Sequence, residues 1–323
     1  MKHQILAFAV AALCFTACTN EDNISQDFLA DTPIKLNVSV DEPTTRAGYS
    51  STELPEGFLL AVYHILEDQT VDKKYSYEVW AKKVGDSWKT YKFNKETNSV
   101  TDEEVTMLWA NMKDKVSVAA FTNLGDITIP TAQTSDDQLK QADVLYMPTA
   151  DCYPKLCKDG INVNLQHAMS KINLTIELGS EYEFSKEDVD LKIKDVKIDG
   201  SLVSATVYAN GIYDEFGVPT PIFPFHTGTT PYSKTNGVIT KASATYEAIL
   251  IPQDIASGNF TVSFKVEGKL YEWAYNNEAG LTLAPNTAYT LKLIAGDDKV
   301  QPASFSVAEW GKGNGDGENK ETD

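Results

Sequence analysis

The chain contains a single arginine, Arg46, so lysine supplies every other basic side chain among the 28 arginine and lysine residues. Acidic residues number 46, and the net charge of -18 leaves no basic surface that could neutralise nucleic-acid phosphates. The Gly-x-Ser-x-Gly, His-Glu-x-x-His and phosphate-binding glycine motifs of common enzyme classes are also missing. We therefore expect neither an enzyme nor a nucleic-acid-binding protein, and we expect no cofactor.

Cysteine is scarce, with four residues in the whole chain. Cys14 and Cys18 lie in an N-terminal targeting segment, which leaves Cys152 and Cys157 for the folded part. In an exported protein these two could form a disulfide within one loop, and the alternative is a pair of unbonded thiols. Because two further ligands of a zinc cage are missing, we expect no metal site.

Long hydrophobic runs are absent, apart from Ile5 to Phe15 behind a short basic start. This run is too short for a stable membrane span and is typical of a signal peptide, which we place at residues 1–17. The run Phe15-Thr16-Ala17-Cys18 resembles the lipobox of bacterial lipoproteins, although Phe stands where Leu is usual. The resemblance implies cleavage before Cys18 and a diacylglycerol on its thiol. The alternative is an ordinary signal peptide followed by an incidental cysteine.

The acyl chains on Cys18, of the palmitate kind, would anchor the protein stably in a membrane. Residues 18–33 would then form a lipidated tether that is acidic near its start. The acidic stretch from Thr19 to Asn23 resembles the tag that sends Bacteroides-type lipoproteins to the outer face of the outer membrane. We therefore expect a surface-exposed protein of the cell outer membrane.

The stretch after the tether predicts a half-buried strand at residues 34–40. Its apolar residues alternate with polar ones, so one face of the strand carries an apolar stripe, which consists of Ile34, Leu36, Val38 and Val40. A polar loop follows and contains Arg46 and Ala47, so an arginine-specific protease cutting between them could detach this strand. The simpler alternative is an ordinary first strand followed by a turn.

The remainder of the chain predicts an all-β fold with one or two short helices in its loops. Short alternating runs recur at regular spacing and are separated by glycine and proline, which is typical of β-sandwiches. We expect one sandwich domain at 34–166, a second at 167–310 and a disordered, glycine-rich acidic tail at 311–323. One short helix is expected near 136–143, and the proline-rich stretch 216–232 is expected to be a loop.

A final alternating strand is expected at residues 303–310. Phe305 and Val307 would lie on one face of it, and Trp310 would close it. The chain therefore has a detachable strand near one end and a loosely attached strand near the other.

Several segments along the chain together resemble the fimbrillin family, the major and minor fimbrial subunits of Bacteroides-type anaerobes. Beyond the lipobox-like residues, these segments are Thr44 to Ala47, Leu108-Trp109, His167 to Lys171, Ile249 to Gln253, Leu283 to Asn286 and Trp310. The resemblance implies two tandem transthyretin-like β-sandwich domains. It also implies export as a lipoprotein and cleavage by an arginine-specific protease at Arg46.

The resemblance further implies assembly by strand exchange. Removing the first strand would open a groove, and a C-terminal strand carrying Phe305 and Val307 from the next subunit would fill it. The expected partners are identical or related fimbrial subunits, the protease, an outer-membrane lipid anchor through Cys18, and host or bacterial surface ligands. The alternative is a surface lipoprotein that does not polymerise, either a tip or anchor subunit or a glycan-binding module.

Overall fold

The computed structural model describes residues 30–40, 49, 53–95, 97, 99–123, 125–157, 159–208, 213–296 and 299–310. These residues form 23 strands and two helices of seven residues each. The predicted all-β class with one or two short helices is therefore confirmed. No helix in the described ranges has the length and apolar character needed to cross a membrane.

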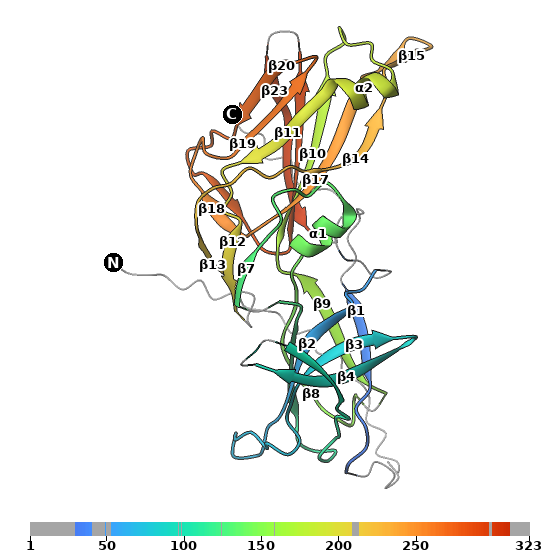
Figure 1. Ribbon diagram of the computed structural model, residues 1–323, viewed down its shortest axis with the longest axis vertical. Coiled ribbons are helices and arrows are strands. Elements are labelled where there is room, and N and C mark those ends of the chain that lie inside the picture. Colours follow the sequence, from blue (N-terminus) through green and yellow to red (C-terminus); the bar gives the residue numbers. More distant parts are fainter. Residues whose placement is uncertain are drawn as a thin grey trace, which may run out of the picture.

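An eight-stranded sheet forms the lower body in Figure 1. All of its neighbouring strands are antiparallel except β1 and β9, which run parallel. In spatial order the strands are β1 (Leu36–Val40), β9 (Ile161–His167), β8 (Leu145–Cys152), β6 (Val116–Phe121), β2 (Gly57–His64), β3 (Tyr77–Val84), β4 (Ser87–Asn94) and β5 (Ser99–Glu104).

This sheet curls around a core of its own. Strand β2 is buried on both faces: Phe58 and Leu60 pack into the main core, while Leu59 packs with Phe121 on the opposite face. The backbone of Pro33, just before β1, forms a bridge with Leu108, beyond β5 in the sequence. The two ends of the sheet are therefore joined around one core.

The upper body in Figure 1 is built from several smaller sheets around a second core. The largest has the order β14 (Phe225–Thr230), β17 (Ser243–Leu250), β10 (Ser170–Leu178), β22 (Thr287–Ala295) and β23 (Val300–Glu309). A three-stranded sheet contains β11 (Ile193–Asp199), β19 (Thr261–Val266) and β20 (Lys269–Ala274), and another contains β13 (Tyr213–Phe216), β12 (Ser204–Val207) and β7 (Gly125–Thr128). Two hairpin-like pairs complete this body, β15 (Ser233–Thr235) with β16 (Val238–Thr240) and β18 (Gln253–Ile255) with β21 (Leu281–Leu283).

The segment from Gly125 to Val144 lies in the upper body, although it falls within the predicted N-terminal domain 34–166. Strand β7 pairs with β12, and α1 (Asp136–Ala142) buries Leu139 against the second core. The chain then returns to the lower body through β8 and β9 and enters the upper body again at β10. The upper body is thus assembled from two separate stretches of the chain.

Local signals account for both helices. Ser135 caps α1 by accepting a hydrogen bond from the backbone of Gln138. Helix α2 (Lys186–Lys192) begins with a capping box in which Ser185 and Asp188 satisfy each other's backbone N–H groups. The short helix predicted near 136–143 is confirmed by α1.

The loop predicted at 216–232 is wrong in part, because β14 occupies Phe225–Thr230. The prolines at 219, 221, 224 and 231 stop short of the strand or follow it, so none removes a donor from its ladder. Strand β14 is an edge strand that pairs with β17, and its register shifts between His226 and Gly228. Pairing with β17, which follows later in the sequence, therefore makes this segment a strand although its prolines suggest a loop.

Candidate functional site

The first strand lies at the edge of the eight-stranded sheet and carries the predicted apolar stripe. Strand β1 pairs with β9 in the register Leu36 to Ile161 and Val40 to Leu165. Val40 is 2% exposed, and the other three members of the stripe are partly buried against the same core. The polar residues between them are exposed. The alternation in the sequence thus separates a core face from a solvent face.

The segment that leads into β1 forms backbone hydrogen bonds with Met107 and Trp109 on the side away from β9. The N–H of Ile34 donates to the carbonyl of Met107 at 2.8 Å, and the N–H of Trp109 donates to the carbonyl of Thr32 at 2.9 Å. On the β9 side, the N–H of Ile161 donates to the carbonyl of Lys35 at 2.8 Å. The first strand therefore fills a slot between β9 and the segment around Met107.

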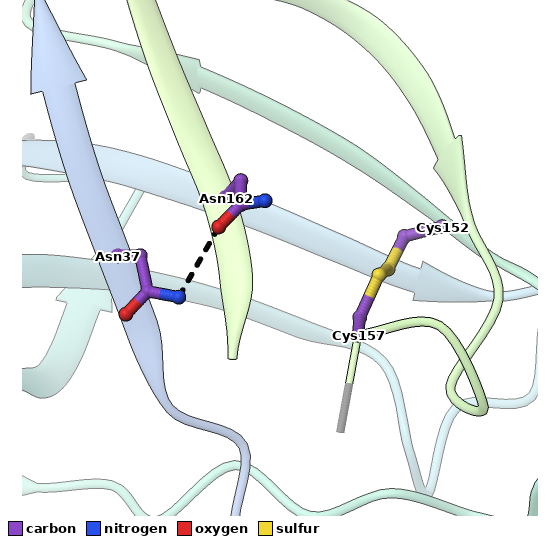
Figure 2. Close-up of a disulfide and its surroundings, with 4 residues drawn as sticks. All are labelled: Asn37, Cys152, Cys157 and Asn162. Atoms are coloured by element: carbon purple, nitrogen blue, oxygen red, sulfur yellow. Dashed lines mark hydrogen bonds between the residues drawn. A yellow bond between two sulfur atoms is a disulfide. The ribbon is translucent and has the colours of Figure 1, made fainter. Parts of the chain in front are cut away.

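Polar side chains on the solvent face fix the register of β1 on β9. Asn37 donates from Nδ2 to Oδ1 of Asn162 at 3.1 Å (Figure 2), and Ser39 donates to Oδ1 of Asn164 at 2.8 Å. At the entry to β9, Gly160 has a φ of +134°. A Cβ at this glycine would lie 3.2 Å from the Lys35 carbonyl oxygen, so a larger residue would push the first strand away.

Beside the apolar residues of the first strand lie their cross-strand partners on β9, the fully buried Ile161, Val163 and Leu165. Without β1, one face of these side chains and one edge of the β9 backbone would meet water. An open strand edge beside an apolar surface is a template for adding another strand. An empty slot of this kind is suited to receive a strand from another chain.

A disulfide joins Cys152 at the end of β8 to Cys157 in the loop before β9 (Figure 2). The carbonyl of Cys157 accepts a hydrogen bond from the N–H of Gly160 at 2.9 Å, which links the closed loop to the entry of β9. Both cysteines pack against the lower core. The bond therefore restrains the loop that leads into the strand paired with β1.

Replacing both Cys152 and Cys157 with serine should lower the free energy of unfolding of the lower body by about 2 kcal/mol. The reason is that the disulfide restricts the conformational entropy of this short loop in the unfolded chain, and the substitutions remove that restriction. Urea titration followed by near-ultraviolet circular dichroism would measure the change. Reduced wild-type protein is the matched control and should unfold at the same urea concentration as the variant. Equal stability of the oxidised and the doubly substituted protein would contradict the prediction.

The C-terminal strand β23 forms the edge of the five-stranded sheet and runs antiparallel to β22. Phe305 packs beside the rings of Tyr275 and Tyr289, with centroids at 5.2 Å and 6.1 Å. Val307 lies two residues further along and is 51% exposed. The strand is thus attached through one edge only, and part of its apolar surface faces water.

Cys18, Arg46 and Ala47 lie outside the described residues, as do the signal peptide, residues 18–29 of the tether and the tail 311–323. The structure places Leu36, Val38 and Val40 on β1 and Ile34 just before it, and it places Phe305 and Val307 on β23. These two groups lie in different bodies of the same chain. The lipidation and cleavage sites remain predictions from the sequence.

A buried polar cluster where the two bodies meet was not predicted. His167 lies at the end of β9, and its Nδ1 is 3.0 Å from Oδ1 of Asp143, which follows α1. On β10, Lys171 forms an ion pair of 3.2 Å with Glu247 of β17. Burial lowers the pKa of the Lys171 ammonium, and the Glu247 carboxylate opposes that change. The sequence contains no signal for this cluster, because Lys171 follows the same polar alternation as Asn173, Thr175 and Glu177 along β10.

Among the described residues, no group of three or more His, Cys, Asp or Glu side chains is arranged to hold a metal ion. His64 is buried between Asp72 and Asp114, with 3.3 Å from each ring nitrogen to a carboxylate oxygen. The aspartates belong to two loops, so His64 ties both loops to the end of β2. The geometry favours a structural role for this histidine.

The sequence matches a family model described as fimbrillin-like over residues 45–310. Two solved structures share the fold. A candidate cell adhesion protein of Bacteroides ovatus is 15% identical, with 87% of this chain and 99% of that chain covered and a TM-score of 0.56. Another from Bacteroides uniformis is 14% identical, with 87% and 99% covered and a TM-score of 0.52. No curated protein matches the chain.

Proposed function

Since the chain belongs to the fimbrillin-like family, we propose that it is a structural subunit of cell-surface fimbriae that supports adhesion. The family and the fold are those of adhesion and fimbrial proteins. In this proposal the protein is exported as a lipoprotein anchored to the outer membrane through Cys18. It is then cut after Arg46 by an arginine-specific protease and polymerises by strand exchange.

The observation that carries the proposal is the edge position of β1 together with its buried stripe. Full burial of four apolar side chains at about 1.5–3 kcal/mol each would give roughly 6–12 kcal/mol before ordering costs, and this is an upper bound because three of the four are partly buried. That amount is comparable to the stability of a whole domain, so an empty slot would bind a replacement strand strongly. The family match also begins at residue 45 and ends at residue 310, close to the chain that a cut after Arg46 would leave.

In the proposed assembly, β23 of one subunit fills the slot of the next. Phe305 and Val307 would replace part of the stripe. The sequence beyond Trp310 has no apolar side chain and could not serve this purpose. A contact between two different surfaces of identical subunits does not close on itself, so it produces a filament.

Replacing Arg46 with alanine should leave a lipidated monomer and no filament, because no other arginine offers a cleavage site. The N-terminus and mass of protein extracted from the cell surface would test this. Wild-type protein should begin at Ala47, and the variant should begin at acylated Cys18. The conservative variant Arg46→Lys is the matched control for charge and should also stay uncut. Filaments built from subunits that retain residues 18–46 would overturn the cleavage step.

The alternative is a subunit that keeps its own C-terminal strand, as a tip or anchor protein or a glycan-binding lipoprotein would. The pairing of β23 with β22 from Val300 to Glu309, with one register shift, favours this alternative for the uncut chain. The two proposals differ in one measurement. A stalk subunit gives heat-labile ladders on gels after cleavage, whereas a capping or anchoring subunit gives a single band.

A further inference from the structure

The place where the two bodies meet contains a buried group of side chains that the proposed function does not use. We call it the junction cluster, and it consists of Asp143, His167, Lys171, Glu247 and Trp310. Its members come from the residue after α1, from β9, β10 and β17, and from the residue after β23. Elements from both bodies therefore converge on one small buried site.

Trp310 covers this cluster. Its ring lies flat on the His167 imidazole, with centroids 4.0 Å apart and planes 3° apart. On the same ring, the Lys171 ammonium lies 5.9 Å from the centroid. Trp310 is 2% exposed, so it is buried against His167 and beside Lys171, one member of each polar pair. Removing the indole would open a space next to both pairs.

The backbone of Trp310 is held as well. Its N–H donates to the carbonyl of Asn286 at 2.8 Å, and the N–H of Asn286 donates to the carbonyl of Met169 at 3.0 Å. Nε1 of Trp310 and Nε2 of His167 are buried and have no hydrogen-bond partner among the described residues. Stacking and exclusion of water thus hold the side chain, and its release would let both nitrogens bind water.

The first strand lies near the same cluster. Val40, the last residue of β1, pairs with Leu165, which is two residues before His167. The N–H of Tyr49, three residues after Arg46 in the sequence, donates to Oδ2 of Asp143 at 2.9 Å. Close by, Glu53 pairs with Lys140 of α1 at 3.0 Å. The chain before the proposed cut is therefore paired with β9 beside His167, and the chain after it is bonded to Asp143, so a cut would leave Tyr49 near a new chain end.

We propose that Trp310 is a latch that holds β23 on its own chain, and that removal of the first strand loosens this latch through Asp143 and His167. The inference rests on the proposed function, in which β1 leaves and β23 becomes the donor. Opening the slot of one subunit would then favour release of that subunit's own C-terminal strand. The released strand would fill the slot of the next subunit. An uncut chain would keep its C-terminal strand docked.

Hydrogen–deuterium exchange of residues 300–310 would test the latch in the monomer. The chain would carry Cys18→Ser to prevent lipidation and would be measured intact and after a single cut by an arginine-specific protease with removal of the first strand. In the intact chain, Trp310→Ala should speed exchange of these amides by about tenfold or more. Trp80→Ala is the matched control, because Trp80 stacks on Phe93 in the lower body, away from β23 and from the junction cluster. It should leave exchange of 300–310 unchanged.

The coupling is tested by comparing intact and cut chains. Cutting should speed exchange of 300–310 in the wild type, and Trp310→Ala should then add much less than it does in the intact chain. His167→Phe keeps an aromatic ring under Trp310 but removes the link to Asp143. In this variant the strand should stay protected when the chain is intact, and cutting should no longer change its exchange.

Two results would overturn the inference: exchange in Trp310→Ala within about twofold of wild type, or equal fold-changes from cutting in wild type and His167→Phe. Neither readout needs filaments to form. If either exchange result contradicts the latch while the cut chain still polymerises, the proposed function stands without the latch. If the coupling is observed but the cut chain gives no filament, the function as a stalk subunit fails and the latch remains.

Discussion

Cutting the chain after Arg46 and removing the released first strand should lower the stability of the lower body by at least about 3 kcal/mol. This follows from the apolar burial in the stripe, at most roughly 6–12 kcal/mol, offset in part by the cost of ordering the strand. For a body of about 100 residues, such a loss corresponds to a fall in Tm of about 12–24 °C. Because Arg46 is the only arginine, one arginine-specific protease makes this cut and no other. Differential scanning calorimetry would measure the change.

A synthetic peptide with the sequence of residues 33–41 should restore the lost stability when it is added to the cut chain. The peptide can form the parallel ladder with β9 and can place the stripe beside Ile161, Val163 and Leu165. The same peptide with Val38→Asp is the matched control and should not bind, because burying an unpaired carboxylate in this slot costs several kcal/mol. A cut chain that keeps its Tm after the first strand is washed away would show that β1 is not a structural strand of the slot.

Val307→Asp should abolish filament formation while leaving the monomer folded. In the monomer Val307 is 51% exposed, so the substitution should change monomer stability by less than about 0.5 kcal/mol. In a donor strand the same side chain would enter an apolar slot, where an unpaired carboxylate would weaken binding by several kcal/mol. Electron microscopy and gel ladders of the cut chain would measure assembly.

The matched control is Ser304→Asp, which adds the same charge to an exposed position on the opposite face of β23. It should assemble normally. Phe305→Asp should also block assembly, but Phe305 packs on Tyr275 and Tyr289, so that variant would weaken the monomer as well. If Val307→Asp forms filaments at the wild-type rate, β23 is not the donor strand in the proposed register.

Local patterns in the sequence predicted the elements whose structure depends on nearby residues. The alternation from Ile34 to Val40 predicted a half-buried strand, and the cap at Ser135 lies directly before the short helix predicted near 136–143. The hairpin of β3 and β4 turns at Gly85 and Asp86, with a positive φ at Gly85, which is a local turn signal of the same kind. In each case the period of the side chains or a turn residue is sufficient, because no distant partner is needed to choose the conformation.

Other features depend on partners far away in the sequence. Strand β14 was missed because its prolines suggest a loop, whereas pairing with β17 makes it a strand. The crossing of β7 and α1 into the upper body depends on β12 and on a core formed by later residues. Nothing near Asp143 in the sequence points to His167, which is 24 residues away, or to Trp310 at the far end of β23.

The sequence by itself determined the all-β class, the apolar stripe of the first strand and the single arginine beside it, because these depend only on composition and on period-two alternation. Only the tertiary structure decided that β1 fills an edge slot beside β9, that Val307 is exposed while Phe305 is packed, and that Trp310 seals the junction cluster. The physical reason is that burial, edge position and buried pairing are properties of surfaces brought together by folding, and such surfaces are formed by residues far apart along the chain.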